Sequence, residues 1–514
     1  MHQKTKTIHQ LRRSLTVAAL LALGATANAG TLFLSNLSGA NEIPAGSGAP
    51  NATGLGIIIV NDAGTSSTIS ANWTGIKGIT GGRIHLGTPA DNGPVTFPFA
   101  AVGNPSAPFT WNLSATALNN LKIGALYLDI TNGDFPDGAI RGQIFRATLS
   151  PAATNVAQNR MANLVLDVAA GITPDLDKIL IQLNLAPLAV QTRALDDLSA
   201  RTVYAPVREQ IEAMTTLTDS LFAQADESRL NPDAAVRKVD AFFKGGESFG
   251  HRSNTANQAG SRVSRPFGTA GIEFNYSADT RAGLALGFTN GQDRFDGGVG
   301  HANTKTTALN VFLSTKVGAG IALDATVGYG VSNVDTLRDL NSIGRRVTAS
   351  FEGNVWSGAL KASKDFKFGG SATIIPYVFV DTQDARFDGY RENDDATVGL
   401  VIPQIKMQNS AVEGGATLLL PFQVSPRTTV TARVQAGWHY LMDEGTKSFA
   451  GQLVSTPLPI FTEFDNPGRS TAHVEASLSA ALGSRTLSTV GYRGELGADG
   501  RTISALEGRV AIRF

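Results

Sequence analysis

The second half of the chain alternates between apolar and polar residues in a series of short runs. The clearest runs are residues 272–276, 284–288, 321–329, 430–440, 474–480 and 510–514. In the last of them Val510, Ile512 and Phe514 share one face, while Ala511 and Arg513 share the other. A period of two residues predicts β-strands that are apolar on one face only.

Several features favour a transmembrane β-barrel over a soluble β-sheet protein. The runs are about ten residues long, which is the length of a tilted strand that crosses a bilayer. Their polar faces carry full charges, as a water-filled interior would: Asp324, Arg433, Glu475, Arg493 and Glu495. Short turns alternate with long polar segments such as residues 293–305 and 335–346. Residues 239–514 are therefore expected to form an antiparallel barrel of the outer-membrane type.

Residues 1–29 have the three parts of an export signal. A basic segment that ends at Arg13 precedes an apolar stretch over residues 15–23, and Ala27-Asn28-Ala29 fits the cleavage rule for signal peptidase. The apolar stretch is too short to cross a bilayer as a helix. A signal peptide followed by a barrel predicts a location in the outer membrane of a Gram-negative cell.

Composition narrows the possible chemistry. The 514 residues include 43 basic and 43 acidic side chains, so the charge balance gives no reason to expect a nucleic-acid partner. The sequence has no cysteine, which excludes disulfides, thiolate nucleophiles and iron–sulfur clusters. It also lacks the motifs of serine hydrolases, zinc proteases and phosphate-binding loops, so we expect no enzymatic activity, no cofactor and no metal.

Short β-type runs also occupy the region between residues 30 and 147. They are residues 31–34, 54–60, 68–73, 83–86, 124–131 and 139–149. Turn-forming segments such as Asn61-Asp62-Ala63-Gly64 separate them. This spacing predicts a small all-β domain of about seven or eight strands, of the sandwich type.

Three motifs of this domain span residues 38–44, 83–87 and 136–144 and contain Glu42, His85 and Arg141. They resemble motifs of the CHRD family, which is named after the repeats of chordin. The resemblance implies a β-fold in a secreted protein and little chemistry. Many bacterial members of the family carry further histidines where this chain has Arg83 and Ile130. His85 therefore lacks the neighbours that a metal site needs.

Between residues 154 and 229 the apolar residues recur at steps of three and four, which predicts helices. Pro174, Pro187 and Pro206 divide this stretch into four pieces. Residues 148–238 are thus assigned to a helical linker, whose last helix covers roughly residues 207–227.

Two further segments are residues 194–199, which read Ala-Leu-Asp-Asp-Leu-Ser, and residues 239–245, which open the predicted barrel. They resemble segments of the autotransporter family: the first is similar to a motif that precedes its translocator domains, and the second is similar to its first barrel strand. The resemblance covers residues 239–514. It implies a barrel of twelve strands, a helix inside the pore and an N-terminal passenger domain outside the cell. The expected fold class is therefore mainly β, with a β-domain at residues 30–147, a helical linker and a 12-stranded barrel.

Two groups of residues have a possible role beyond the fold. Val510, Ile512 and Phe514 are expected to form a signal for the barrel-assembly machinery, and the simpler alternative is a strand that only faces lipid. For the charged residues of the polar faces, plain hydration of the lumen is favoured over ion selectivity or pairing with the pore helix.

The residues of the CHRD-like motifs are expected to be structural. Glu42 and Arg141 are predicted to pair and so join the first strand to the last, with the binding of a partner as the alternative. His85 is predicted to be hydrogen bonded inside the domain rather than to bind a metal.

The function expected from these patterns is that of a monomeric autotransporter in the outer membrane. Its barrel would display the CHRD-like domain at the cell surface, for binding or adhesion. Its partners would be the lipid of the outer membrane, the barrel-assembly machinery and an extracellular protein or glycan. One alternative is a porin-like channel whose N-terminal domain stays in the periplasm, and another is a surface metalloenzyme that uses His85.

Overall fold

The structure is a computed structural model that describes residues 30–101, 103–229, 239–277, 279–368, 372–425, 428–442, 447–464, 470–482, 486–497 and 500–513. The predicted signal peptide and Phe514 lie outside these residues. The chain forms two compact units, one built mainly from residues before Ala200 and one built mainly from residues after Ser199. The first unit also contains residues 396–399 and 452–460.

The first unit begins with an antiparallel sheet. Its strands, within the described residues, are β1 (Gly30–Ser38), β2 (Thr53–Asn61), β3 (Ser66–Thr74), β4 (Ile79–Leu86), β5 (Val95–Phe99), β6 (Phe109–Asn112), β7 (Leu126–Asn132) and β8 (Ile140–Arg146). They follow the order β5-β4-β7-β8-β1-β2-β3-β6. Strands β5 and β6, and the short helix α2 (Ala115–Lys122), are additions to the elements that the sequence patterns predicted.

The sheet curls so that its two edge strands approach each other. Phe97 of β5 stacks on Trp111 of β6 with 5.3 Å between the ring centroids, and Phe99 lies 5.5 Å from Phe109. One continuous sheet therefore encloses the core. All the fully buried side chains of this core come from residues between Phe33 and Ile144, so the β-domain has a hydrophobic core of its own.

Three helices complete the first unit: α3 (Val156–Leu164), α4 (Pro174–Leu185) and α5 (Leu188–Leu198). The prolines mark helix starts, as predicted. Pro174 is the first residue of α4, and the hydroxyl of Thr173 accepts a hydrogen bond from Leu176 N–H at 3.2 Å. None of the helices in the described part of the chain is long and apolar enough to cross a bilayer.

The second unit is a closed antiparallel barrel of twelve strands, as counted over the described residues. The strands are β9 (Val239–Arg252), β10 (Ser261–Asn275), β11 (Thr280–Phe295), β12 (Gly300–Val317), β13 (Ile321–Leu340), β14 (Arg345–Lys364), β16 (Ala372–Phe387), β19 (Ile405–Ser425), β20 (Thr428–Leu441), β23 (Ser470–Leu482), β24 (Thr486–Gly497) and β25 (Thr502–Arg513). The last strand pairs with the first, β25 with β9, and β14 pairs with β16. The expected 12-stranded barrel is thereby confirmed.

The alternation along the strands separates the two faces of the barrel. On β13, Val327 is 56% exposed and Tyr329 is 38% exposed, whereas Asp324 is 1% exposed. Apolar residues thus point outward and polar residues point into the lumen, as the sequence predicts. The outward apolar band on this strand runs from Ile321 to Val331, which at roughly 3.4 Å per residue and a tilt of about 40° spans about 25 Å.

Two expected long loops are instead strands. Residues 293–305 and 335–346, predicted as polar loops, mostly extend β11 to β14, and they leave only short turns at residues 296–299 and 341–344. Both faces of a strand are polar once it emerges from the membrane, so alternation disappears there although the backbone ladder continues. The long connections are residues 388–404 and 442–469. They hold β17 (Tyr390–Arg391), β18 (Leu400–Ile402), β21 (Lys447–Leu453) and β22 (Pro459–Phe464), which form a small sheet.

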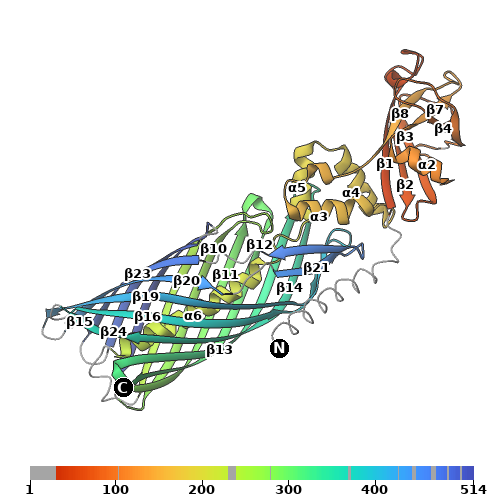
Figure 1. The fold of residues 1–514 in the computed structure, drawn as a ribbon. Coiled ribbons are helices and arrows are strands. Elements are labelled where there is room, and N and C mark those ends of the chain that lie inside the picture. The colour runs from red at the N-terminus through yellow and green to blue at the C-terminus, as the bar shows by residue number, and fades with distance from the viewer. Residues whose placement is uncertain are drawn as a thin grey trace. The chain divides into compact units, whose positions relative to one another are not determined.

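Helix α6 (Ala205–Arg229) runs through the barrel (Figure 1). The pore helix predicted for residues 207–227 is therefore present. The chain continues from its C-terminal end to the start of β9, at the end of the barrel where the short turns lie. Its N-terminal end is at the opposite end, which carries the long connections.

Candidate functional site: the helix-filled lumen of the barrel

We call α6 the lumen helix. The residues just before it are hydrogen bonded to the turn between β9 and β10. Arg201 donates a hydrogen bond to Asn254 Oδ1 at 2.9 Å, and the N–H of Ala259 donates one to the Arg201 carbonyl at 3.1 Å. Tyr204 is buried, and its ring stacks on Phe464 of β22 at 4.5 Å. The chain that precedes the helix therefore leaves the barrel among the long connections.

A buried cluster of charges joins the first turns of the lumen helix to the barrel wall. Glu209 and Glu212 lie one turn apart, so both reach the same side of the helix. Arg265 of β10 donates hydrogen bonds to Glu209 at 2.9 Å and to Glu212 at 2.5 Å. Arg252 of β9 donates one to Glu212 at 2.5 Å. Because an unpaired buried charge is costly, these contacts fix the rotation and the depth of the helix.

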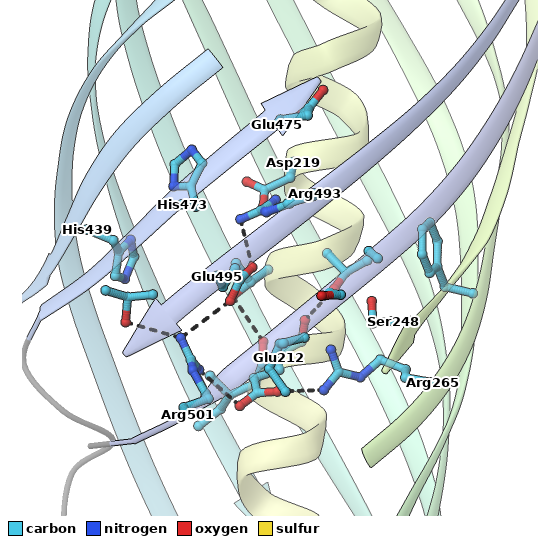
Figure 2. A pocket seen from close by; sticks show the side chains of 18 of the residues that line it. Glu212, Asp219, Ser248, Arg265, His439, His473, Glu475, Arg493, Glu495 and Arg501 are labelled. Carbon is cyan, nitrogen blue, oxygen red and sulfur yellow. Dashed lines mark hydrogen bonds and ion pairs between the residues drawn. The ribbon is translucent and has the colours of Figure 1, made fainter. Parts of the chain in front are cut away.

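Acidic residues of the helix meet basic residues of the wall further along the lumen. The pairs are Asp219–Arg493, Asp226–Lys361 at 2.7 Å and Glu227–Arg509 at 2.5 Å. Figure 2 shows Asp219 directed toward Arg493, and Glu212 close to Arg265 and Arg501. The helix thus supplies the carboxylates and the barrel supplies the cations.

This arrangement corrects the prediction of a lumen whose charges are merely hydrated. Arg433 lies 3.4 Å from Asp226, and Arg493 bonds Asp219, so both arginines contact the helix. The same arginines also pair with carboxylates of the barrel wall. Arg433 lies 2.7 Å from Glu475, and Arg493 lies 3.1 Å from Glu495. Pairing with the pore helix, which the sequence analysis ranked below hydration, is what the structure shows.

The sequence contained a signal for this pairing. Glu209, Glu212, Asp219 and Asp226 are spaced by three, seven and seven residues, which keeps the four carboxylates on one face of a helix. Their partners belong to β9, β10, β14, β20 and β24, far away in the sequence. The acidic face could have been predicted, but its partners required the closed barrel.

The residues proposed as the assembly signal lie on the outer face of the closing strand. Val510 is 42% exposed and Ile512 is 45% exposed, and they pair with Phe243 and Ala241 of β9. Phe514 lies outside the described residues. The outward orientation suits lipid contact, and the role as an assembly signal stays a prediction.

In the β-domain, Arg141 of the closing motif contacts the opening motif and the segment around Asn92. Its side chain is 2% exposed and donates hydrogen bonds to Asn92 Oδ1 at 2.7 Å and to the carbonyl of Asp91 at 2.7 Å. Its guanidinium carbon lies 3.6 Å from the centroid of the Tyr127 ring. The Arg141 carbonyl accepts a hydrogen bond from Asn41 Nδ2 at 3.0 Å. The expected direct pair with Glu42 is thus replaced by contacts to the segment around residue 92.

His85 and Glu42 are buried beside this network. His85 Nδ1 donates to the carbonyl of Gly93 at 2.9 Å, and its Nε2 lies 3.5 Å from Asp129 Oδ2. The Oε1 atom of Glu42 has no hydrogen-bond partner among the described residues. Burial raises the pKa of Glu42 to about 8, helped by the charge of Asp129 and opposed by Arg141 and Arg83.

The raised pKa of Glu42 predicts a pH dependence for the stability of the β-domain. The folded state holds the proton up to about pH 8, while the unfolded chain loses it near pH 4.5. The free energy of unfolding should therefore fall as the pH rises from 4.5 to 8. Glu42→Gln should remove this fall and stabilise the domain at pH 9 by roughly 1–3 kcal/mol. The free energy of unfolding can be measured at each pH by urea unfolding of residues 30–199, monitored through the fluorescence of Trp73 and Trp111.

Asp134→Asn, which alters an exposed carboxyl of the same domain, is the matched control and should keep the pH profile of the wild type. A Glu42→Gln profile that falls as steeply as the wild type would contradict the role given to Glu42.

The comparisons with known proteins agree with both halves of this description. A family model described as the autotransporter beta-domain matches residues 241–493. The barrel is an autotransporter β-domain. A second model, the CHRD domain, matches residues 33–144, so the N-terminal β-domain is a CHRD domain. The search of curated proteins found no match to the chain.

Solved structures of translocator domains match part of the chain. The translocator domain of the autotransporter NalP from Neisseria meningitidis is 15% identical, with a TM-score of 0.44, over 58% of this chain and 98% of that one. The β-domain of the Bordetella autotransporter BrkA is 16% identical, with a TM-score of 0.40, over 54% and 99%. The transport unit of AIDA-I from Escherichia coli is 11% identical, with a TM-score of 0.38, over 54% and 90%.

Membership of this family places the autotransporter barrel in the outer membrane and in type V secretion. The described residues contain no group of three or more His, Asp or Glu side chains arranged to hold a metal ion.

Proposed function

We propose that this autotransporter displays its CHRD domain at the cell surface, where the domain binds an extracellular protein or glycan. The observation that supports this is the direction of the lumen helix. Outer-membrane barrels keep short turns in the periplasm and long connections outside. The chain that enters the helix emerges among the long connections, near Phe464, so residues before Ala200 are expected outside the cell.

The proposed role is anchoring and binding, without catalysis. The lumen helix, paired with the wall through Glu209 and Glu212, ties the displayed domain to a barrel that is itself surrounded by lipid. One chain forms the whole barrel through the β9–β25 pairing, which fits a monomer. Assembly is expected to need the barrel-assembly machinery, which would recognise the closing strand.

Single cysteines test the orientation, because the natural chain has none. Lys122→Cys lies on an exposed position of α2 in the CHRD domain, and Ser277→Cys lies on an exposed position of the short turn between β10 and β11. A membrane-impermeant maleimide added to intact cells should label Lys122→Cys within minutes. Ser277→Cys should react only after the outer membrane is permeabilised. Labelling of Ser277→Cys but not of Lys122→Cys on intact cells would reverse the orientation and favour the porin-like alternative.

A further inference from the structure

A row of basic residues crosses the outer face of the barrel near the end that carries the long connections. The strand register places His251 of β9 opposite Arg262 of β10. Arg294 of β11 lies opposite both Arg262 and His301 of β12. The first three of these side chains are exposed and His301 is half-buried. Neighbouring strands lie roughly 4.8 Å apart, so these four residues, which we call the basic row, extend over about 14 Å.

The basic row lies beyond the lipid-facing surface of the same strands. On β11 the outward apolar residues end at Phe288, which is 49% exposed, and Arg294 follows six residues later on the same face. At roughly 3.4 Å per residue and a tilt of about 40°, Arg294 is about 15 Å further from the membrane centre than Phe288. Phospholipid head groups add only about 5–8 Å on each side of the hydrocarbon core. A lipid that reaches Arg294 therefore needs a larger head group.

Two arginines of the row face each other with no acid to compensate them. Arg262 and Arg294 are direct neighbours across β10 and β11, and like charges in that arrangement destabilise a sheet. Among the described residues, the Arg262 side chain has no hydrogen-bond or ion-pair partner, and the one partner of Arg294 is the neutral side chain of Gln292, at 3.0 Å. The fold itself therefore leaves these two positive charges without a counter-charge.

A third cation lies between the row and the lipid-facing surface. Lys305 of β12 is exposed, lies opposite Asn290 and Asn333, and has no ion-pair partner in the part of the chain that the structure describes. It comes four residues before Leu309, where the outward apolar residues of this strand begin. The cations without a carboxylate partner thus face outward at more than one distance from the lipid.

Two carboxylates lie near the row, and each has another partner. Asp296 Oδ2 lies 3.0 Å from His251 Nε2, and Glu247 Oε1 accepts a hydrogen bond from Ser264 at 2.7 Å. Within the described ranges, neither carboxylate is paired with an arginine of the row. Together with Lys305, the row therefore keeps an excess of positive charge.

Other exposed arginines of the outer face do have a carboxylate partner. Arg346 of β14 lies 2.6 Å from Asp339, and Arg386 of β16 lies 3.0 Å from Asp384. An external anion would have to displace these carboxylates. The two arginines of the basic row can take an anion without breaking an ion pair.

Phosphate is the anion that suits this geometry. A guanidinium group binds phosphate through two parallel hydrogen bonds, and two arginines opposite each other can hold one phosphate between them. In an outer membrane, the lipids that carry phosphates on a large sugar head group are the lipopolysaccharides of the outer leaflet.

We propose that the basic row, together with Lys305, binds the phosphorylated sugar head group of lipopolysaccharide. The contact holds a glycolipid against the outer surface of β9 to β12. This proposal rests on the proposed orientation of the barrel, which puts the long connections in the outer leaflet, and it is independent of what the CHRD domain binds.

Fluorescence anisotropy of labelled rough lipopolysaccharide, which consists of lipid A and the phosphorylated inner core, tests the proposal. The full-length protein in non-ionic detergent micelles should bind this lipid saturably. Combining Arg262→Gln with Arg294→Gln should raise the Kd by at least about tenfold, because charge-assisted hydrogen bonds to phosphate are lost. Micelles have no sides, so this result does not depend on the cysteine labelling that tests the orientation.

Arg346→Gln combined with Arg386→Gln is the matched control. It removes two exposed arginines of the outer face, and hence the same charge, away from the row. Its Kd should stay within about twofold of the wild type, because exposed charges further apart than a Debye length are screened. Hydrogen exchange of the β9 amides should match the wild type in both double variants, which shows that the barrel is still closed.

Unlabelled competitors identify the group that is bound. Dephosphorylated lipopolysaccharide and phosphatidylglycerol should compete poorly with the labelled lipid. The proposal is wrong if the wild type does not bind, if both double variants lose affinity equally, or if the dephosphorylated lipid competes as well as the native one. Displacement by inorganic phosphate or heparin as effective as that by lipopolysaccharide would make the row a general anion site and would also overturn the proposal.

Discussion

Replacing Glu209 and Glu212 together by glutamine is expected to lower the free energy of local opening of the lumen helix by about 3–5 kcal/mol. Both substitutions keep the size of the side chain and remove its charge. Arg265, which is 2% exposed, would then lose both carboxylates that it contacts. Removing one partner of a buried ion pair has a cost in this range because a buried cation is left unpaired.

Hydrogen exchange of the α6 amides in detergent micelles measures the loosening. Since every 1.4 kcal/mol is a factor of ten, protection should fall by roughly a hundredfold to several thousandfold. Adding Arg265→Gln to the double variant should restore part of the protection, because the uncompensated charge is then gone.

Thr216→Ala is the control within the same helix. The Thr216 hydroxyl donates a hydrogen bond to the carbonyl of Glu212, four residues earlier in its own helix, at 2.8 Å. Removal of this hydroxyl should change the free energy of local opening of the helix by no more than about 0.5 kcal/mol. If the double glutamine variant behaves like Thr216→Ala, the charged cluster does not hold the helix.

Arginine at Val327 is expected to destabilise the folded barrel by about 2–4 kcal/mol, the cost of a cation at the membrane midplane. Val327 is 56% exposed on the outer face of β13, in the apolar band between Ile321 and Val331. The cost arises because lipid cannot hydrate the guanidinium group.

A second position on β13 serves as the control for Val327. Asn333 is exposed on the same face, just beyond that band, and pairs with Lys305 and Glu352 on the neighbouring strands. Asn333→Arg should therefore lower the free energy of unfolding of the barrel by only about 0–1 kcal/mol. Guanidinium unfolding of each variant in lipid vesicles gives both values. Equal costs at the two positions would mean that the apolar band does not lie in the membrane.

The alternation of residues predicted the strands, and the length of the runs, the charges on their polar faces and the pattern of turns then favoured a barrel. Lipid on one side and water on the other impose a strict period of two, so Val434 and Arg433 could be assigned to opposite faces from the sequence alone. The prediction of strand ends failed beyond the lipid, where both faces of a strand meet water. Residues 335–340 have charged side chains on both faces, with Asp335 and Asp339 on one and Arg338 on the other, and were predicted as part of a loop. They are nevertheless paired with β14.

The contacts in the lumen and in the CHRD domain were harder to predict, because they depend on which distant segments meet. Arg141 was paired with Glu42 from their charges, but the guanidinium group has better hydrogen-bond acceptors near Asn92. Arg493 and Asp219 are more than two hundred residues apart, and only the path of α6 through the barrel brings them together. Charge complementarity alone does not identify the partner of a buried ion.

The pairing of β25 with β9 has a consequence for the order of assembly. Val510 and Phe243 are roughly 270 residues apart, so the entropy lost in bringing the two ends of the barrel together is near the maximum for this chain. Until they meet, β9 and β25 each have an unpaired row of backbone groups that could join a foreign strand and aggregate. A protein that temporarily covers β25 would prevent such aggregation until the two strands pair.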